Sequence, residues 1–143
     1  MTPAALFSVA NTVALGSWLV LAIAPWRPAL ALVPRMAAPL LFAVAYSAIV
    51  AVHWAGSDGG FSSLAAVAAL FDHPWMLLAG WIHYLAFDML IGAWEVQDAL
   101  ERGVPRWLVL PCLGLTFLFG PAGWLAYVAV RTATAPSPSR SGR

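Results

Sequence analysis

The sequence predicts an all-α integral membrane protein, a bundle of four transmembrane helices with a short surface or re-entrant helix between the second and the third. Composition is the first observation: of 143 residues, 62% are hydrophobic and 9% are charged. The second is a mean hydropathy of +0.84, well above that of a soluble domain. The third is length, because about 20 apolar residues cross a bilayer as a helix and the chain has room for about four such runs.

The first two predicted spans cover residues 3–24 and 36–54. The first ends at Pro25, because proline cannot continue a helix. No basic residue precedes this apolar run, so we interpret it as a retained anchor and not as a cleaved signal peptide. The second span has Pro39 in its first turn, where proline is tolerated.

The stretch 61–74 has too few apolar residues to cross the bilayer, and its serines suit the cap of a short helix. Pro74 opens the third span, which covers residues 74–94 and continues as a helix to about residue 101. Gly103 then ends that helix. The fourth predicted span covers residues 107–130 and contains the pair Gly120-Pro121, where we expect a kink or a break.

We expect residues 1–131 to form one transmembrane domain and residues 132–143, which lack apolar periodicity, to be a disordered tail. The chain contains no lysine, and its richness in alanine, arginine and tryptophan is typical of a bacterium with GC-rich DNA. The predicted location is therefore a bacterial inner membrane, crossed several times.

All seven basic residues are arginines in loops, turns or the tail, and they form no basic patch, which excludes nucleic acid as a partner. Four spans would place one group of arginines on one face of the membrane: Arg27, Arg35, Arg102 and Arg106. The remaining arginines would lie on the other face: Arg131, Arg140 and Arg143. By the positive-inside tendency the first group is expected to face the cytoplasm, whereas the second group favours the opposite orientation.

Ionisable residues inside the third span are the main functional signal. A charge at the bilayer centre costs about 2.5–3.5 kcal/mol on insertion scales, so it normally has a partner or a task. We predict His83, Asp88 and Glu95 as catalytic residues. Asp88 and Glu95 are seven residues apart and share a helix face, whereas His83 points about 140° away from Asp88 at about 100° per residue.

A second set of polar and aromatic residues is predicted to line a cavity for an apolar ligand that carries a few oxygens. These predicted substrate-binding residues are Asn11, Tyr46, Trp81, Tyr84, Phe87, Trp94, Thr116 and Phe117. Asn11, Tyr46 and Thr116 have an ordinary alternative, because such side chains often form hydrogen bonds between membrane helices. The expected partners are membrane lipid and this ligand, and a homo-oligomer stays open.

Two segments carry a resemblance to a known family. The stretches "GWIHYLAFDMLIGAWEVQDA" (80–99) and "PCLGLTFLFGPAGWLAY" (111–127) resemble the membrane-protein family typified by the plant abscisic-acid-deficient-four protein. Its plant members are linked to the conversion of violaxanthin to neoxanthin. The matching positions are His83, Tyr84, Asp88, Trp94, Glu95, Asp98, Gly120, Pro121 and Gly123. Ala93 and Gln97 depart from the basic residues of the plant pattern, and neoxanthin is not an expected product of a bacterium. The expected substrate is therefore a carotenoid or a related isoprenoid.

The resemblance implies an isomerase of the neoxanthin synthase type, which turns an epoxide into an allene by acid-base catalysis and needs no cofactor. Asp88 and His83 would exchange the protons, and Tyr84 would bind the substrate oxygen. Two alternatives remain. One is a metal-dependent enzyme with a divalent ion held by His83, Asp88, Glu95 and Asp98. The other is an accessory membrane subunit that binds a carotenoid or lipid without catalysis.

Overall fold

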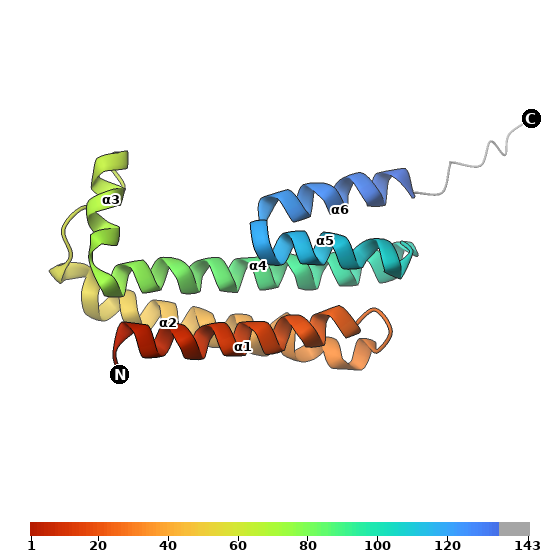
Figure 1. The fold of residues 1–143 in the computed structure, drawn as a ribbon, viewed down its shortest axis with the longest axis horizontal. Coiled ribbons are helices and arrows are strands. Elements are labelled where there is room, and N and C mark those ends of the chain that lie inside the picture. The colour runs from red at the N-terminus through yellow and green to blue at the C-terminus, as the bar shows by residue number, and fades with distance from the viewer. Residues whose placement is uncertain (135–143) are drawn as a thin grey trace, which may run out of the picture.

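The computed structural model describes residues 1–134, and these residues contain helices, turns and loops but no strand. Of the predicted disordered tail (132–143), residues 135–143 lie outside the described residues. The α-helices in chain order are α1 (Pro3–Ile23), α2 (Ala38–His53), α3 (Leu64–Asp72), α4 (Pro74–Arg102), α5 (Arg106–Phe119) and α6 (Pro121–Ala133). Figure 1 shows α1, α2, α4, α5 and α6 running along one long axis and α3 standing across it. The all-α prediction is confirmed.

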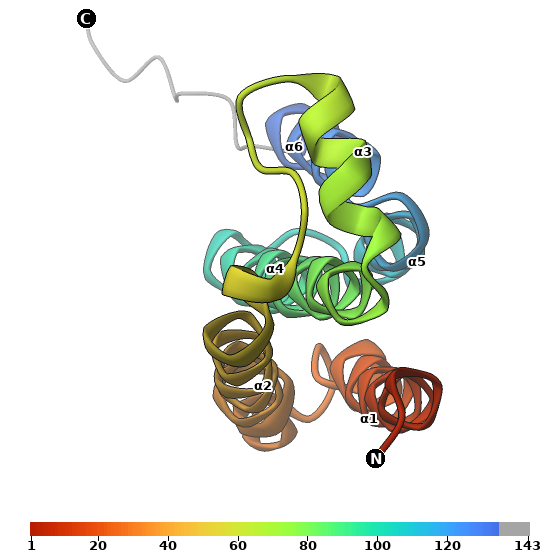
Figure 2. The same cartoon turned by 90° about the vertical axis from the view of Figure 1, so that its left-hand side faces the viewer.

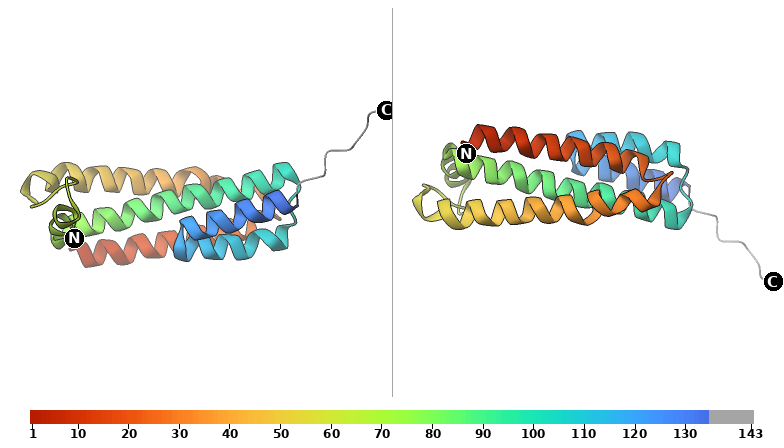
Figure 3. Two further views of the ribbon diagram at one scale, coloured as in Figure 1. Left: turned by 90° about the horizontal axis from the view of Figure 1, so that it is seen from above. Right: turned by 90° about the horizontal axis from the view of Figure 1, so that it is seen from below.

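Three helical segments are long and apolar enough to cross a membrane: Pro3–Ile23, Pro28–Gly56 and Pro74–Arg102. The middle one consists of α2 with a 3₁₀ turn and a π-helical stretch (Val33–Ala37) before it and a 3₁₀ turn after it. The three segments run side by side in both views of Figure 3. Many large apolar side chains on their outer surfaces are exposed, as expected for helices that face lipid.

Local signals in the sequence set the helix ends. The Ser63 hydroxyl accepts a hydrogen bond from the Ala66 N–H at 3.1 Å, so a serine caps α3 as predicted. Pro74 is the first residue of α4, and Gly103 ends that helix with a left-handed φ of +70°. These three expectations are confirmed.

The predicted fourth span is not a single helix. Residues 106–119 form α5, the chain reverses at Gly120, and residues 121–133 return as α6 alongside α5 (Figure 1). Gly120 has φ +44° and ψ −99°, a backbone conformation that residues with a Cβ rarely adopt. Pro121 follows as the first residue of α6, where its missing N–H costs nothing. The sequence predicted a kink or break at this pair, and the structure contains a full reversal.

Helix α4 is the centre of the molecule and contacts each of the other α-helices. Viewed along the long axis, α1 and α2 lie on one side of α4, and the hairpin of α5 and α6 lies on the other side (Figure 2). The hairpin covers only the C-terminal half of α4, whereas α1 and the helical segment Pro28–Gly56 run beside most of its length (Figure 1). The face of α4 that meets the hairpin carries the carboxylates described next.

Candidate functional site

Three carboxylate side chains of α4 are buried where this helix meets the hairpin. Asp88 is 9% exposed, Glu95 is 0% exposed and Asp98 is 8% exposed. The spacing of seven and three residues keeps them on one helix face. They differ in their partners, and these differences separate a structural carboxylate from two that are candidates for function.

Asp88 lies beside the turn of the hairpin. A Cβ atom added to Gly120 would come within 2.7 Å of the Asp88 Oδ1 atom, so only glycine allows this close approach. The Oδ2 atom of Asp88 is buried and has no hydrogen-bond partner among residues 1–134. Buried polar atoms in native proteins are nearly always paired, so an unpaired carboxylate oxygen indicates a functional group.

Glu95 lies about 10 Å farther along α4, at 1.5 Å per residue. The Thr116 hydroxyl of α5 donates a hydrogen bond of 2.8 Å to its Oε1 atom. The other oxygen, Oε2, is buried without a partner in the described part of the chain. Thr116 was predicted to bind substrate, and the structure shows the ordinary alternative, a hydrogen bond between helices.

Asp98 is fully partnered and connects α4 to α6. Its Oδ1 atom accepts a hydrogen bond of 2.8 Å from the Arg102 Nε atom, and its Oδ2 atom accepts one of 2.7 Å from the Tyr127 hydroxyl. The Arg131 Nε atom lies 3.5 Å from the same Oδ2 atom. With these partners Asp98 holds the returning helix of the hairpin in place, which is a structural role.

Tyr127→Phe should destabilise the protein by about 1–3 kcal/mol, because it removes a hydrogen bond to a charged group and leaves the Asp98 oxygen underbonded. The measurement is the free energy of unfolding in detergent micelles. Tyr46→Phe is the matched control, since the Tyr46 hydroxyl has no hydrogen bond within residues 1–134. A loss of equal size in both variants would contradict the structural role of the Tyr127 hydroxyl.

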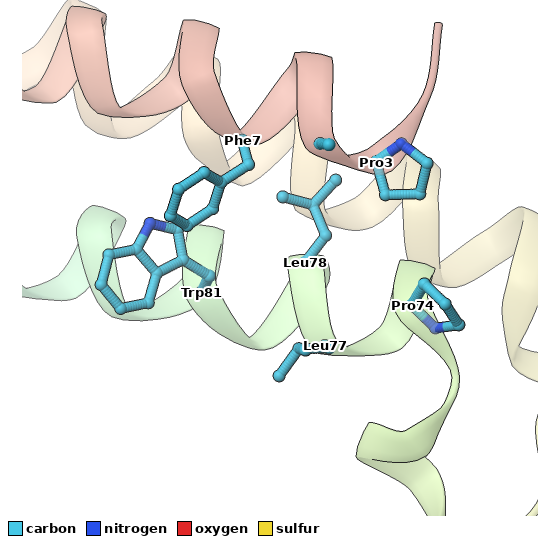
Figure 4. Close-up of a pocket in the computed structure, with 7 residues that line it drawn as sticks. Pro3, Phe7, Pro74, Leu77, Leu78 and Trp81 are labelled. Atoms are coloured by element: carbon cyan, nitrogen blue, oxygen red, sulfur yellow. The ribbon is translucent and has the colours of Figure 1, made fainter.

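An apolar groove runs between α1 and α4. Its outer part has a volume of about 480 Å³ and is lined by Pro3, Ala4, Phe7, Pro74, Leu77, Leu78 and Trp81 (Figure 4). Trp81 separates this outer part from an inner part of about 300 Å³, which is lined by residues of α1, α4 and α5. No ionisable side chain lines the outer part, so it suits a hydrocarbon chain.

Four predicted substrate-binding residues line the inner part of the groove: Asn11, Trp81, Tyr84 and Phe117. The Trp81 Nε1–H donates to the Asn11 Oδ1 atom at 3.1 Å, and the Tyr84 hydroxyl donates to the Phe117 carbonyl at 3.1 Å. The Tyr84 hydroxyl also lies within interaction distance of the Asp88 carboxyl group, one helical turn away. The polar end of the groove is therefore next to the unpaired carboxylate.

His83 is not part of this arrangement. It is exposed on another face of α4, where its ring centroid lies 5.6 Å from that of Tyr46 and 4.6 Å from that of Phe87. His83 and Tyr46 also border a separate cavity of about 260 Å³ between α2, α3 and α4. The predicted exchange of protons between His83 and Asp88 is not assembled, because the two residues leave α4 in different directions.

Trp94 and the four predicted metal ligands are not gathered at the groove either. The Trp94 ring packs edge-on against Tyr127 at 5.6 Å and lies 5.5 Å from the Arg131 guanidinium carbon, so it belongs to the contact between α4 and α6. Within residues 1–134, no three histidine, cysteine, aspartate or glutamate side chains gather as ligands of one metal ion. The set named for the metal alternative is therefore not brought together.

Sequence reasoning missed the partners of Asp98. Tyr127 lies within the quoted stretch 111–127, but it was not singled out, and Arg131 was assigned to the opposite face of the membrane. The available signal was the expected break at Gly120-Pro121. A chain that turns back there brings residues 127 and 131 to the level of Asp98.

Comparison with known protein families shows a match over most of the chain. A family model described as ABA DEFICIENT 4-like matches residues 5–127, which include the three carboxylates, the turn of the hairpin and most residues of the groove. No curated protein matches the sequence significantly, and no solved structure does so either.

Proposed function

The chain belongs to the ABA DEFICIENT 4-like family, and from this premise we propose that it is a membrane-embedded isomerase of a carotenoid or a related isoprenoid. Family membership suggests a role in the carotenoid and abscisic acid pathway. Helices long and apolar enough to cross a membrane are consistent with a substrate that dissolves in lipid. The isomerase activity and its residues are our proposal.

One observation carries the proposal: Tyr84, which lines the inner part of the apolar groove, neighbours the buried carboxylate of Asp88, whose Oδ2 atom has no hydrogen-bond partner among residues 1–134. Asp88 itself lines neither part of the groove. An oxygenated carotenoid or isoprenoid matches both features, because its long hydrocarbon chain suits the apolar groove and the oxygen function at one end suits the polar groups. We place the hydrocarbon chain along Phe7 and Trp81, and the oxygen function at Tyr84.

The proposed reaction is an isomerisation of an epoxide to an allenic alcohol, in which Asp88 and Tyr84 exchange protons with the substrate. Asp88 removes a proton from the polyene carbon beside the epoxide, and that electron pair forms the new double bond. The bond between carbon and oxygen breaks, and the Tyr84 hydroxyl gives its proton to the departing oxygen. Asp88 then returns its proton to Tyr84, so substrate and product have the same composition.

This assignment changes the role of two predicted residues. Tyr84 replaces His83 as the counterpart of Asp88, because only Tyr84 borders both the groove and the carboxylate. Glu95 lies behind Asp88 on the same helix face and is proposed as a second acid-base group that does not touch the substrate. We further propose that the reaction needs no metal ion, which elemental analysis of the purified protein would test.

Trp81→Ala tests the groove. Trp81 borders both parts, and its ring lies 5.4 Å from that of Phe7 and 5.3 Å from that of Tyr84. Removing this ring merges the two parts and takes away a contact with the hydrocarbon chain. We expect binding of a carotenoid to weaken about 10-fold to 100-fold, since an aromatic ring that the ligand covers contributes about 1–3 kcal/mol. The measurement is retention of pigment by purified protein.

Trp107→Ala is the matched control for this measurement, because Trp107 is 69% exposed and borders neither part of the groove. Equal pigment retention by Trp81→Ala and Trp107→Ala would contradict the placement of the ligand.

The direct test of the function is pigment analysis of carotenoid-producing cells with and without the chain. The proposal expects a new pigment of unchanged mass in cells that express the protein. A protein that retains pigment but never converts it, in cells that supply epoxidised carotenoids, would favour the alternative of a binding subunit. That alternative has one supporting observation, namely that the Trp81 and Tyr84 donors in the groove are already hydrogen-bonded.

A further inference from the structure

We infer that α5 and α6 form a re-entrant hairpin, which enters and leaves the membrane at the same face, and that this face is the cytoplasmic one. The chain would then cross the bilayer three times, by α1, α2 and α4, and its two termini would lie on opposite sides. This inference is independent of the proposed reaction.

The length of the two helices is the first argument. Helix α5 has 14 residues and α6 has 13, so each is about 20 Å long, whereas the hydrocarbon core is about 30 Å thick. Neither helix crosses the bilayer alone, and the reversal at Gly120 prevents them from forming one longer span. Glu95 contacts α5, and Asp98 contacts α6, so both helices lie beside the same half of α4.

The polarity of the hairpin is the second argument. Arg106 begins it and Arg131 lies near its end, and residues 107–130 between them contain no charged residue. At the tip, Leu118 is 61% exposed and Phe119 is 63% exposed. Two large exposed apolar side chains at a turn are costly in water but favourable in lipid. Both ends of the hairpin therefore suit the interface, and its tip suits the hydrocarbon.

The packing of the turn is the third argument. Backbone that leaves the helical conformation inside a membrane is tolerated only where protein covers it. Gly120 and Gly123 are buried, with Gly120 against Asp88 and Gly123 in close contact with the Thr116 backbone. The two glycines of the turn are therefore covered by α4 and α5, whereas the side chains of Pro121 and Ala122 are exposed.

The distribution of arginines gives the orientation. The hairpin places every arginine among residues 1–134 at one end of the bundle, which we call the arginine face: Arg27, Arg35, Arg102, Arg106 and Arg131. The opposite end of the bundle carries Asp58 in a loop and Asp72 at the end of α3, and residues 54–73 there contain no arginine or lysine (Figure 1). Loops rich in arginine remain in the cytoplasm, where anionic head groups attract them. The arginine face therefore fits the cytoplasmic leaflet.

Cysteine labelling of intact cells tests this topology. The chain has a single native cysteine, Cys112, so Cys112→Ala provides the background. Single cysteines are then introduced at exposed positions of this background: Ala29→Cys, Asp58→Cys, Leu118→Cys and Ala133→Cys. A maleimide that cannot cross membranes is applied before and after permeabilisation.

We expect Asp58→Cys to react in intact cells, and Ala29→Cys and Ala133→Cys to react only after permeabilisation. Leu118→Cys should stay unlabelled in both conditions, because lipid surrounds it. Labelling of Ala133→Cys in intact cells together with Asp58→Cys would show four crossings and overturn the hairpin. Labelling of Ala29→Cys and Ala133→Cys in intact cells, with Asp58→Cys protected, would overturn the orientation.

A second measurement needs no substitution. A green fluorescent protein fused after Arg143 should fluoresce, and an alkaline phosphatase fused at the same place should be inactive, because the inferred location of this end is cytoplasmic. An active phosphatase fusion with a dark fluorescent fusion would overturn the inference.

Discussion

Asp88→Asn is expected to lower conversion of the substrate by a factor of about 10²–10⁴, the usual contribution of a positioned acid-base group. Asparagine has nearly the same shape as aspartate but cannot take up the proton that the reaction removes from carbon. The side chain would still fit beside Gly120, so the fold and the apolar groove should be unchanged. Binding of the carotenoid should therefore stay within about 3-fold of the wild type, well under 1 kcal/mol.

The measurement compares product formation and pigment retention for the same purified variant. Asp72→Asn is the matched control, because it makes the same chemical change at an exposed residue of α3 and should retain full activity. Full conversion by Asp88→Asn would exclude Asp88 as the base. If Asp88→Asn lost both pigment retention and conversion, the carboxylate would instead be needed for binding or folding.

Gly123→Ala is expected to destabilise the protein by about 3 kcal/mol or more, at the upper end of the cost of overpacking. A Cβ atom at Gly123 would overlap the backbone nitrogen and Cα of Thr116. Neither can move aside like the end of a flexible side chain, so α5 and α6 would have to separate. That separation also disturbs the hydrogen bond from Thr116 to Glu95.

Gly114→Ala is the matched control, since Gly114 lies in α5 and a Cβ there meets no atom within 4 Å. This variant should be as stable as the wild type or slightly more stable, because alanine is the better helix former. The measurement is the free energy of unfolding in micelles for the two variants side by side. Similar stabilities would mean that the hairpin does not pack as tightly at Gly123 as described.

The sequence was sufficient to predict the parts of the fold that depend on local chemistry. Long apolar runs predicted the helices, Ser63 predicted the cap of α3, and Gly103 predicted the end of α4. The sequence was also sufficient to single out Asp88 and Glu95, since a carboxylate within an apolar run is unusual whatever tertiary contacts the helix makes.

The hairpin depends on contacts that no local pattern contains. A stretch of 24 uncharged residues between Arg106 and Arg131 fits one straight span as well as two short helices. Contacts between distant residues favour the two short helices. Gly123 packs against Thr116, and Tyr127 and Arg131 interact with the Asp98 carboxylate. These residues become neighbours only after the chain has reversed, so their spacing along the sequence does not predict the contacts between them.

The predicted site failed to assemble in one respect for a geometric reason. A single helix directs His83 and Asp88 about 140° apart, at about 100° per residue, and a shared cavity would have needed both directions to meet. Different helices neighbour the two residues, with α2 and α3 beside the exposed His83 and the hairpin beside the buried Asp88. Tyr84, four residues from Asp88, is the residue that meets both the carboxylate and the groove.

The shortness of the hairpin affects how a lipid-soluble molecule would arrive. Because α5 and α6 cover only half of α4, the outer part of the groove between α1 and α4 is left uncovered on the side that faces the acyl chains. A carotenoid could then slide in sideways without passing through water. Its capture would depend on how many pigment molecules share a given area of bilayer, so turnover should follow the pigment-to-lipid ratio and not the amount added to the buffer.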